Sequence, residues 1–271
     1  MKQFVYLCLI VLTLGSCVAT QRLCINQMDR WSSGNELYLN GPVKTVRVDE
    51  QVFESEGHFL HASKTPYLKE RFEFDRNGRR VESYDYALDG RELPKTTDIY
   101  NEKNWLIRQD TYSALTKKPH LETRYSYDKD GNILEAAQYS LDDNKLLQKW
   151  NFVHDPTKNY FVLTDIDSQN RWNGQLGFLK DANCRVYEMS AFSKNGTLAA
   201  RITLSYDNGG IPVASVTSNA AGKITETRKV EYEFDSRGNW IKKSDFAQKT
   251  ANGNSTWKLM NIVYRRIEYY N

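Results

Sequence analysis

The chain has 271 residues, enough for one large all-β domain or two ordinary ones, and its 37 basic and 34 acidic side chains leave a net charge of only +3. This near-balance, without a long basic run, argues against a nucleic-acid-binding protein. Aromatic residues make up 13% of the chain, which favours β-strands because flat rings fit a pleated, half-buried surface.

Residues 1–16 have the form of an export signal. Lys2 precedes an apolar run over residues 4–14, which is too short for an ordinary membrane-spanning helix and is followed by small residues. The segment LGSC, ending at Cys17, resembles the bacterial lipobox. This resemblance implies a lipoprotein signal peptide with Cys17 as the acylated N-terminus, where each buried CH₂ adds roughly 0.8 kcal/mol of membrane affinity. The alternative is ordinary cleavage after Ala19, which would give a secreted protein.

Residues 17–38 are polar and show no periodicity, so we expect a tether that leads to a folded domain over residues 39–271. Apart from Cys8 in the signal and the acylated Cys17, two cysteines remain, Cys24 and Cys184. An even pair in an oxidising compartment suggests a disulfide. The alternative is two independent thiols, because a sequence alone shows no geometry.

A strand that closes on an aromatic or, once, an aliphatic residue and then enters a polar turn recurs along the rest of the chain. The closing residues are spaced 26, 27, 26, 25, 28, 28 and 30 residues apart, and so steady a period indicates a repeat architecture. They are Phe74, Tyr100, Tyr127, Val153, Phe178, Tyr206 and Phe234, and the last spacing leads to Tyr264, which begins a truncated last unit.

Each repeat predicts two antiparallel strands. In LETRYSY, residues 121–127, apolar and polar side chains alternate as in a half-buried strand. The turn that follows contains Asp128, which can hydrogen-bond nearby backbone, and Gly131, which tolerates a positive φ. Residues 133–139 form the return strand, and a second short turn leads into the next repeat.

The segments FDRNGRRV, YDKDGNIL, YDNGG and FDSRGNWI resemble the YD-repeat or RHS-repeat class of bacterial surface and secreted proteins. The opening LNGPVKTVRV, residues 39–48, is similar to the first strand of small Bacteroidetes-type repeat lipoproteins of unknown function. The resemblance covers the chain from about residue 41 to its end and implies an architecture. Toxin members of the RHS class also carry a C-terminal effector domain, which nothing in this sequence resembles.

About 15 or 16 strands of about seven residues each would form a long antiparallel meander. A flat layer would leave its apolar face in water, so we expect an all-β fold whose sheet curls into a barrel-like or spiral form. Residues 41–52 and 260–270 are expected to be the terminal caps of the array. A transmembrane barrel is disfavoured, because strands of about seven residues are shorter than the roughly 9–11 that span a bilayer.

The sequence contains no nucleophile-elbow, phosphate-loop or zinc-protease motif. His58 and His61 are three residues apart in an expected hairpin loop, where we interpret them as solvated side chains rather than metal ligands. Acidic residues fall at the starts of turns, where they would bind backbone amides. We therefore expect no catalytic residue, no metal site and no cofactor.

Three tryptophans, Trp105, Trp172 and Trp240, are the candidate ligand-binding residues. Aromatic rings on a rigid scaffold can form platforms for sugar rings or peptides. The alternative is that these large side chains fill the curled sheet or stack across its strands.

The sequence thus predicts a non-enzymatic repeat protein of the bacterial cell envelope. We expect it to be lipid-anchored in the outer membrane facing the periplasm, with surface exposure left open, and to bind a polysaccharide or an envelope protein. One alternative is a glycan-active enzyme with acidic residues on neighbouring strands. Another is a purely structural envelope protein or a periplasmic immunity factor.

Overall fold

The computed structural model describes residues 39–53, 65–155, 157–251 and 254–271, and these residues form sixteen β-strands without a helix. The proposed signal peptide and tether lie outside the described residues. The strands are β1 (Val43–Val52), β2 (Tyr67–Phe74), β3 (Arg80–Asp85), β4 (Thr96–Tyr100), β5 (Leu106–Tyr112), β6 (Pro119–Tyr127), β7 (Ile133–Ser140), β8 (Leu146–Asp155), β9 (Tyr160–Asp167), β10 (Trp172–Lys180), β11 (Val186–Phe192), β12 (Leu198–Tyr206), β13 (Pro212–Asn219), β14 (Ile224–Phe234), β15 (Trp240–Ala251) and β16 (Asn254–Tyr269).

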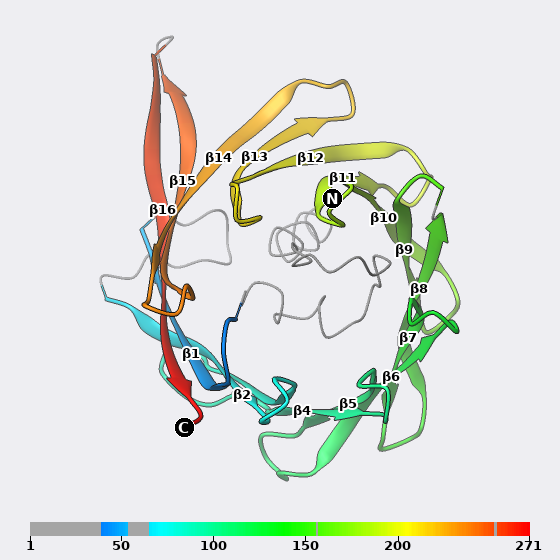
Figure 1. Ribbon diagram of the computed structural model, residues 1–271. Helices are drawn as coiled ribbons and strands as arrows, with labels where there is room; N and C mark the ends of the chain where they lie inside the picture. Colours follow the sequence, from blue (N-terminus) through cyan, green and yellow to red (C-terminus); the bar gives the residue numbers. More distant parts are fainter. Residues whose placement is uncertain (1–38, 54–64, 156, 252–253) are drawn as a thin grey trace. The chain divides into compact units, whose positions relative to one another are not determined.

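Each strand is hydrogen-bonded to the strands before and after it in the sequence, and the strand order closes between β16 and β1 (Figure 1). The topology is that of a closed barrel, so the expected all-β meander is confirmed and an open spiral is excluded. The strands are more variable than the expected seven residues, since β4 has 5 residues and β16 has 16.

The first and last strands do not cap the array, as the sequence suggested, but pair with each other. In this antiparallel pair Val46 lies opposite Ile267 and Glu50 lies opposite Val263. A sheet edge exposes unpaired backbone N–H and C=O groups, and pairing the two ends of the meander removes both edges at once.

Contacts within the chain divide it into two compact units, which we describe separately. Among the described residues, unit 1 comprises 99–110 and 119–225, and unit 2 comprises 39–98, 111–118 and 226–271.

Because successive strands are antiparallel, the turns between them alternate between two edges of the sheet. Edge A, as we call it, carries the turns that follow the even-numbered strands up to β14, and edge B carries those that follow the odd-numbered strands. The edge A turns begin 26, 27, 27, 26, 26 and 28 residues apart, at Asp75, Asn101, Asp128, Asp155, Asp181, Asp207 and Asp235. The described edge B turns repeat the first five of these spacings, at Ala87, Ser113, Ser140, Asp167, Ser193 and Asn219.

This period is steadier than the one read from the closing aromatic residues. In two repeats the residue next to the turn is not the predicted closing residue. The turn at Asp155 directly follows His154 and not Val153, and the turn at Asp181 directly follows Lys180 and not Phe178. The repeat is therefore fixed by its turns, and the aromatic residue before a turn can be replaced.

The turn at Asp75 shows how the sequence builds this module. Oδ1 of Asp75 accepts hydrogen bonds from the backbone amides of Asn77 (2.9 Å) and Arg79 (3.0 Å). Gly78 takes a φ of 77°, the left-handed conformation that follows a type I turn in many hairpins. The same pair of amide bonds recurs at Asp128, Asp167, Asp181 and Asp235. The expectation that these acids stabilise backbone turns is confirmed.

The residue before an edge A turn often reaches back to the preceding repeat. At three edge A turns of unit 1 its side chain bonds the backbone carbonyl oxygen of a residue just beyond the previous edge A turn. The bonds run from Tyr127 Oη to Leu106 (2.8 Å), from His154 Nε2 to Ile133 (2.7 Å) and from Tyr206 Oη to Val186 (2.6 Å). These bonds tie adjacent repeats together where the strands leave their turns.

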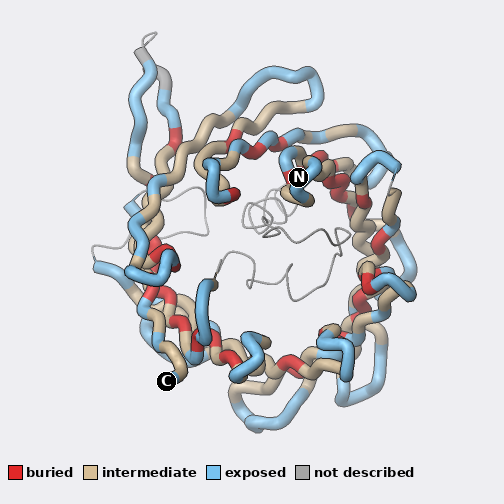
Figure 2. The backbone as a smooth tube through the Cα atoms, in the orientation of Figure 1, coloured by how far each residue is buried: buried red, intermediate tan, exposed pale blue. Residues whose placement is uncertain are grey.

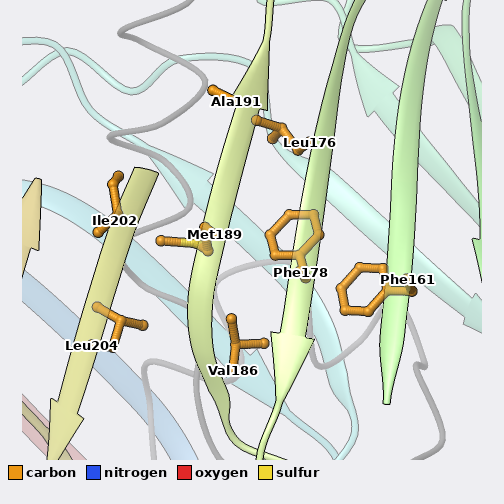
Figure 3. Packing of buried hydrophobic residues seen from close by; sticks show 8 residues of the cluster. All are labelled: Phe161, Leu176, Phe178, Val186, Met189, Ala191, Ile202 and Leu204. Carbon is orange, nitrogen blue, oxygen red and sulfur yellow. The ribbon is translucent and has the colours of Figure 1, made fainter. Parts of the chain in front are cut away.

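One face of the sheet carries the apolar side chains. In unit 1 a cluster drawn from β9 to β12 packs around Phe161 and Phe178, whose rings stack with centroids 4.4 Å apart (Figure 3). In unit 2 a second cluster includes Val46, Phe72 and Trp240. Burying each large apolar side chain contributes about 1.5–3 kcal/mol. Buried segments alternate along the strands with less buried ones, and the turns between strands are largely exposed (Figure 2).

Candidate functional site

The three tryptophans suggested as binding platforms have rings that are covered to different degrees. Trp105 is half-buried, its ring centroid lies 5.3 Å from that of Tyr127, and the Lys103 ammonium lies 4.7 Å from its centroid. Trp240 is 3% exposed and belongs to the apolar cluster of unit 2, with the Arg265 guanidinium 3.1 Å from its ring centroid. The position of Trp240 therefore favours the packing role over ligand binding.

Trp172 keeps more of the features expected of a binding residue. It is half-buried beside the edge B turn at Gly196, and its indole N–H is buried without a hydrogen-bond partner in the described part of the chain. A buried indole N–H usually has an acceptor. A role for Trp172 and Trp105 in ligand binding stays a prediction.

Cys184 occupies the left-handed position of an edge A turn, with a φ of 65°, and is disulfide-bonded. Its predicted partner Cys24, like Cys17, lies outside the described residues, as do His58 and His61, so the Cys24–Cys184 pairing remains a prediction. No group of three or more His, Cys, Asp or Glu side chains within the described ranges is arranged to hold a metal ion.

The sequence analysis missed a polar cluster on the face of unit 2 that also carries its apolar cluster. Glu50 is 3% exposed. Its carboxylate accepts hydrogen bonds from the Asn261 amide (2.9 Å) and the Tyr67 hydroxyl (3.2 Å), and the Lys69 ammonium lies 3.0 Å away. Burying a charge is costly unless it is paired and hydrogen-bonded, and here both conditions are met.

A second carboxylate pair lies close to Glu50 on the same face. Glu70 and Asp85 are direct cross-strand partners on β2 and β3, and Glu70 also pairs across to Val48, two residues before Glu50. Like charges directly opposite each other on one face destabilise a sheet. Asp85 is exposed to solvent, and the charge of Lys69 acts on both carboxyl groups and opposes their repulsion.

The environments of these carboxyl groups shift their pKa values in opposite directions. Burial alone would raise the pKa of Glu50, but the charge of Lys69 and hydrogen bonds from Lys69, Asn261 and Tyr67 outweigh it and hold the pKa low. Burial raises the pKa of Glu70, and the charge of Asp85 adds to this against the opposing charge of Lys69. Acid and base roles are separated in this way at catalytic sites, although structural ion pairs do the same.

The same carboxylate gives Tyr67 an unusual pKa. Burial and the negative charge of Glu50 raise the pKa of the Tyr67 phenol to about 12, so this hydroxyl stays a proton donor at any physiological pH. The Glu50 cluster, which we define as Glu50, Tyr67, Lys69 and Asn261, is thus an ionised carboxylate held by three donors.

The opposite, polar face of unit 2 carries a row of alternating charged and aromatic side chains, which we call the polar-face ladder. Its contacts are Tyr112 to Lys95 (ring centroid to ammonium, 5.0 Å), Lys95 to Glu82 (2.7 Å), Glu82 to Tyr84 (a hydrogen bond), Tyr84 to Arg71 (ring centroid to guanidinium, 3.9 Å) and Arg71 to Glu73 (3.6 Å). The members are half-buried against one another, so the ladder is an ordered polar surface.

Comparison with known proteins does not assign a family. No protein-family model matches the chain, and no curated protein matches its sequence. The resemblance to YD or RHS repeats therefore rests on the quoted segments alone. The described residues contain no helix with the length and apolar character needed to cross a lipid bilayer.

Similar solved structures include two porin-like proteins. The protein from Bacteroides uniformis ATCC 8492 is 13% identical, with a TM-score of 0.40 over 85% of this chain and 98% of its own. The protein from Bacteroides vulgatus ATCC 8482 is 11% identical, with a TM-score of 0.42 over 84% of this chain and 99% of its own. TcdB2-TccC3 without its hypervariable C-terminal region is 12% identical, with a TM-score of 0.28 over 85% of this chain and 16% of its own. At these values none of the similarities assigns a function.

Proposed function

We propose that the protein is a non-enzymatic barrel of the bacterial cell envelope that presents the polar-face ladder of unit 2 to a polysaccharide or an envelope protein. The observation that carries this proposal is the ladder itself, in which rings and paired charges are fixed side by side across neighbouring strands. Ordered donors, acceptors and ring faces on a rigid scaffold suit a polar polymer, because few side chains need to be immobilised on binding.

The charges on the polar face of unit 2 suit contact with water and not with lipid. Ion pairs such as Arg266 to Asp49 (2.9 Å) and Lys242 to Glu233 (2.6 Å) lie on the same face as the ladder. Lipid-facing surfaces of membrane barrels instead carry an apolar band. In this proposal the membrane attachment is made by acyl chains on Cys17, as the lipobox resemblance implies, and not by the sheet.

Retention on immobilised envelope polysaccharides, together with pull-down from envelope membranes, tests the proposed binding. We expect the double variant Arg71→Ala/Lys95→Ala to lose retention, because each substitution removes a cation that covers a ring and pairs with a carboxylate. Lys149→Ala/Lys242→Ala is the matched control, since it removes two lysines that also pair with glutamates. Equal retention of the two double variants would refute the ladder as the binding surface.

The opposite pKa shifts of Glu50 and Glu70 favour a second candidate, a glycan-active enzyme. In that case Glu70 would act as the acid and Glu50 as the carboxylate of the pair. Release of reducing ends from a polysaccharide by the wild type, and its loss in Glu70→Gln, would support the enzyme. Binding without turnover supports the proposed binding protein.

A further inference from the structure

We propose that two adjacent turns at edge B of unit 2 dock on an anionic lipid surface through exposed leucines. Leu88 lies in the turn between β3 and β4, and Leu115 lies in the turn between β5 and β6. The inference extends the proposed envelope location, since it requires a nearby membrane, but it is independent of the polar-face ladder and of any acyl chain on Cys17.

Both leucine side chains are exposed to solvent. The side chain of Leu88 is 54% exposed and that of Leu115 is 94% exposed. The two turns are neighbours, because the backbone amide of Tyr112, just before the second turn, donates to the Lys95 carbonyl just beyond the first (2.9 Å). Isolated surface leucines need no explanation, but apolar tips on two adjacent hairpins indicate a contact surface.

Hydrogen bonds order the backbone of the β5–β6 turn that carries Leu115. The Ser113 hydroxyl accepts hydrogen bonds from the backbone amides of Leu115 and Thr116, both at 3.3 Å. The Lys117 amide donates to the Ser113 carbonyl (3.0 Å), and Lys117 takes a left-handed φ of 56°. These bonds fix the backbone with Leu115 at the tip.

The β3–β4 turn is fixed in a similar way. The Gly90 amide donates to the Ala87 carbonyl (2.8 Å), and the Arg91 amide donates to the Asp89 carboxylate (2.9 Å). Leu88 is thereby held at the tip of its turn, so both leucines are presented by ordered backbone.

The charges beside the more exposed leucine decide which partner fits. Lys117 and Lys118 follow Leu115 after the single residue Thr116, and both are exposed. At the other turn the exposed Arg91 is balanced by Asp89, 3.9 Å away, and by the neighbouring Glu92. An apolar tip followed by a basic pair matches acyl chains beneath anionic headgroups, where each lysine near the surface strengthens binding about fivefold.

Vesicle binding of the full chain, carrying Cys17→Ser so that no acyl chain contributes, tests this inference. We expect mixed phosphatidylcholine–phosphatidylglycerol vesicles to slow amide hydrogen exchange at residues 113–118 and 86–92. Leu115→Ser should weaken co-sedimentation about tenfold. Lys117→Gln/Lys118→Gln should remove the preference for these mixed vesicles over vesicles of phosphatidylcholine alone. Phe234→Ser is the matched control, because Phe234 is 45% exposed but precedes an edge A turn of the same unit.

Unchanged hydrogen exchange at residues 113–118, or equal weakening by Leu115→Ser and Phe234→Ser, would overturn the inference. Far-ultraviolet circular dichroism of both serine variants checks that the sheet is retained. Neither result bears on polysaccharide retention by the polar-face ladder or on the acylation of Cys17, so this inference can fail while the proposed function holds.

Discussion

His154 stands where Tyr127 and Tyr206 stand in two other repeats of unit 1, and this exchange places a group that titrates near neutral pH at the end of β8. Burial lowers the pKa of His154, against the raising effect of its bond to the Ile133 carbonyl. The folded protein therefore prefers neutral imidazole. The associated stability is present above the unfolded pKa of about 6.5 and is lost as the pH falls through the folded-state pKa.

We predict that His154→Tyr removes this part of the pH dependence, because the tyrosine hydroxyl can donate to the Ile133 carbonyl as Tyr127 donates to Leu106. The measurement is the free energy of unfolding in urea at pH 7.5 and at pH 5.0. The drop between the two pH values should be smaller in the variant than in the wild type. Parallel pH profiles of wild type and variant would show that His154 does not titrate on folding.

Asn239 joins the start of the described chain to its end. It is fully buried, its amide donates to the Asn40 carbonyl (2.9 Å) and to the Tyr269 hydroxyl (2.6 Å), and its Oδ1 accepts from the Asn40 amide (2.5 Å). Asn132, at the same position of another edge A turn, donates from its side chain to Asp128 (2.8 Å). The comparison of these two asparagines isolates the bonds to Asn40 and Tyr269.

We predict that Asn239→Ala lowers the free energy of unfolding by about 3 kcal/mol, because it removes three hydrogen bonds made by a fully buried side chain, each contributing about 1 kcal/mol. Asn132→Ala should cost only about 1 kcal/mol, since the bond that it removes is within its own turn. Urea unfolding of both variants measures the difference. Equal losses would mean that the Asn40 and Tyr269 bonds contribute nothing net.

At the scale of the turn, one residue must adopt a left-handed backbone conformation, and the sequence must supply a residue that tolerates it. Gly78 has a φ of 77°, and a Cβ at this position would meet no atom within 4 Å. We predict that Gly78→Ala costs about 1 kcal/mol purely through backbone strain. Gly209→Ala is the control, because Gly209 does not have a left-handed φ and a Cβ there would make only ordinary contact with Asp207 (3.4 Å). Equal urea midpoints for the two variants would contradict a strain-based cost.

The turns and strands could be predicted because each is a local pattern. Asp128, Gly131 and the alternation in residues 121–127 specify one hairpin without reference to the rest of the chain. The closing residues were a weaker guide, since His154 and Lys180 hold the places assigned to Val153 and Phe178.

The Glu50 cluster was missed for a different reason. In VKTVRVDEQV, alternation places Glu50 on the same face of the strand as Val46, Val48 and Val52. A carboxylate at an otherwise apolar position of this strand was the one feature of the sequence that could have indicated the cluster. Its partners Tyr67, Lys69 and Asn261 come from β2 and β16, and no local pattern links them. A cluster assembled across strands requires the register, which a single sequence does not state.

At the scale of the whole molecule, closure is the feature that a local reading cannot supply. Pairing between β1 and β16 joins the first and last described strands, and the sequence left a barrel-like and a spiral sheet both open. Closure pairs the backbone N–H and C=O groups of β1 and β16, which at an open sheet edge could pair with other chains. The proposed roles in binding and lipid contact both assume this closed scaffold.

Amide–amide nuclear Overhauser effects between β1 and β16 test closure most directly. On a perdeuterated sample we predict cross-strand contacts in the register that places Val46 opposite Ile267, Val48 opposite Arg265 and Glu50 opposite Val263, together with slow hydrogen exchange of the β1 amides. Fast exchange along β1, with no contact between the two strands, would contradict the closed barrel.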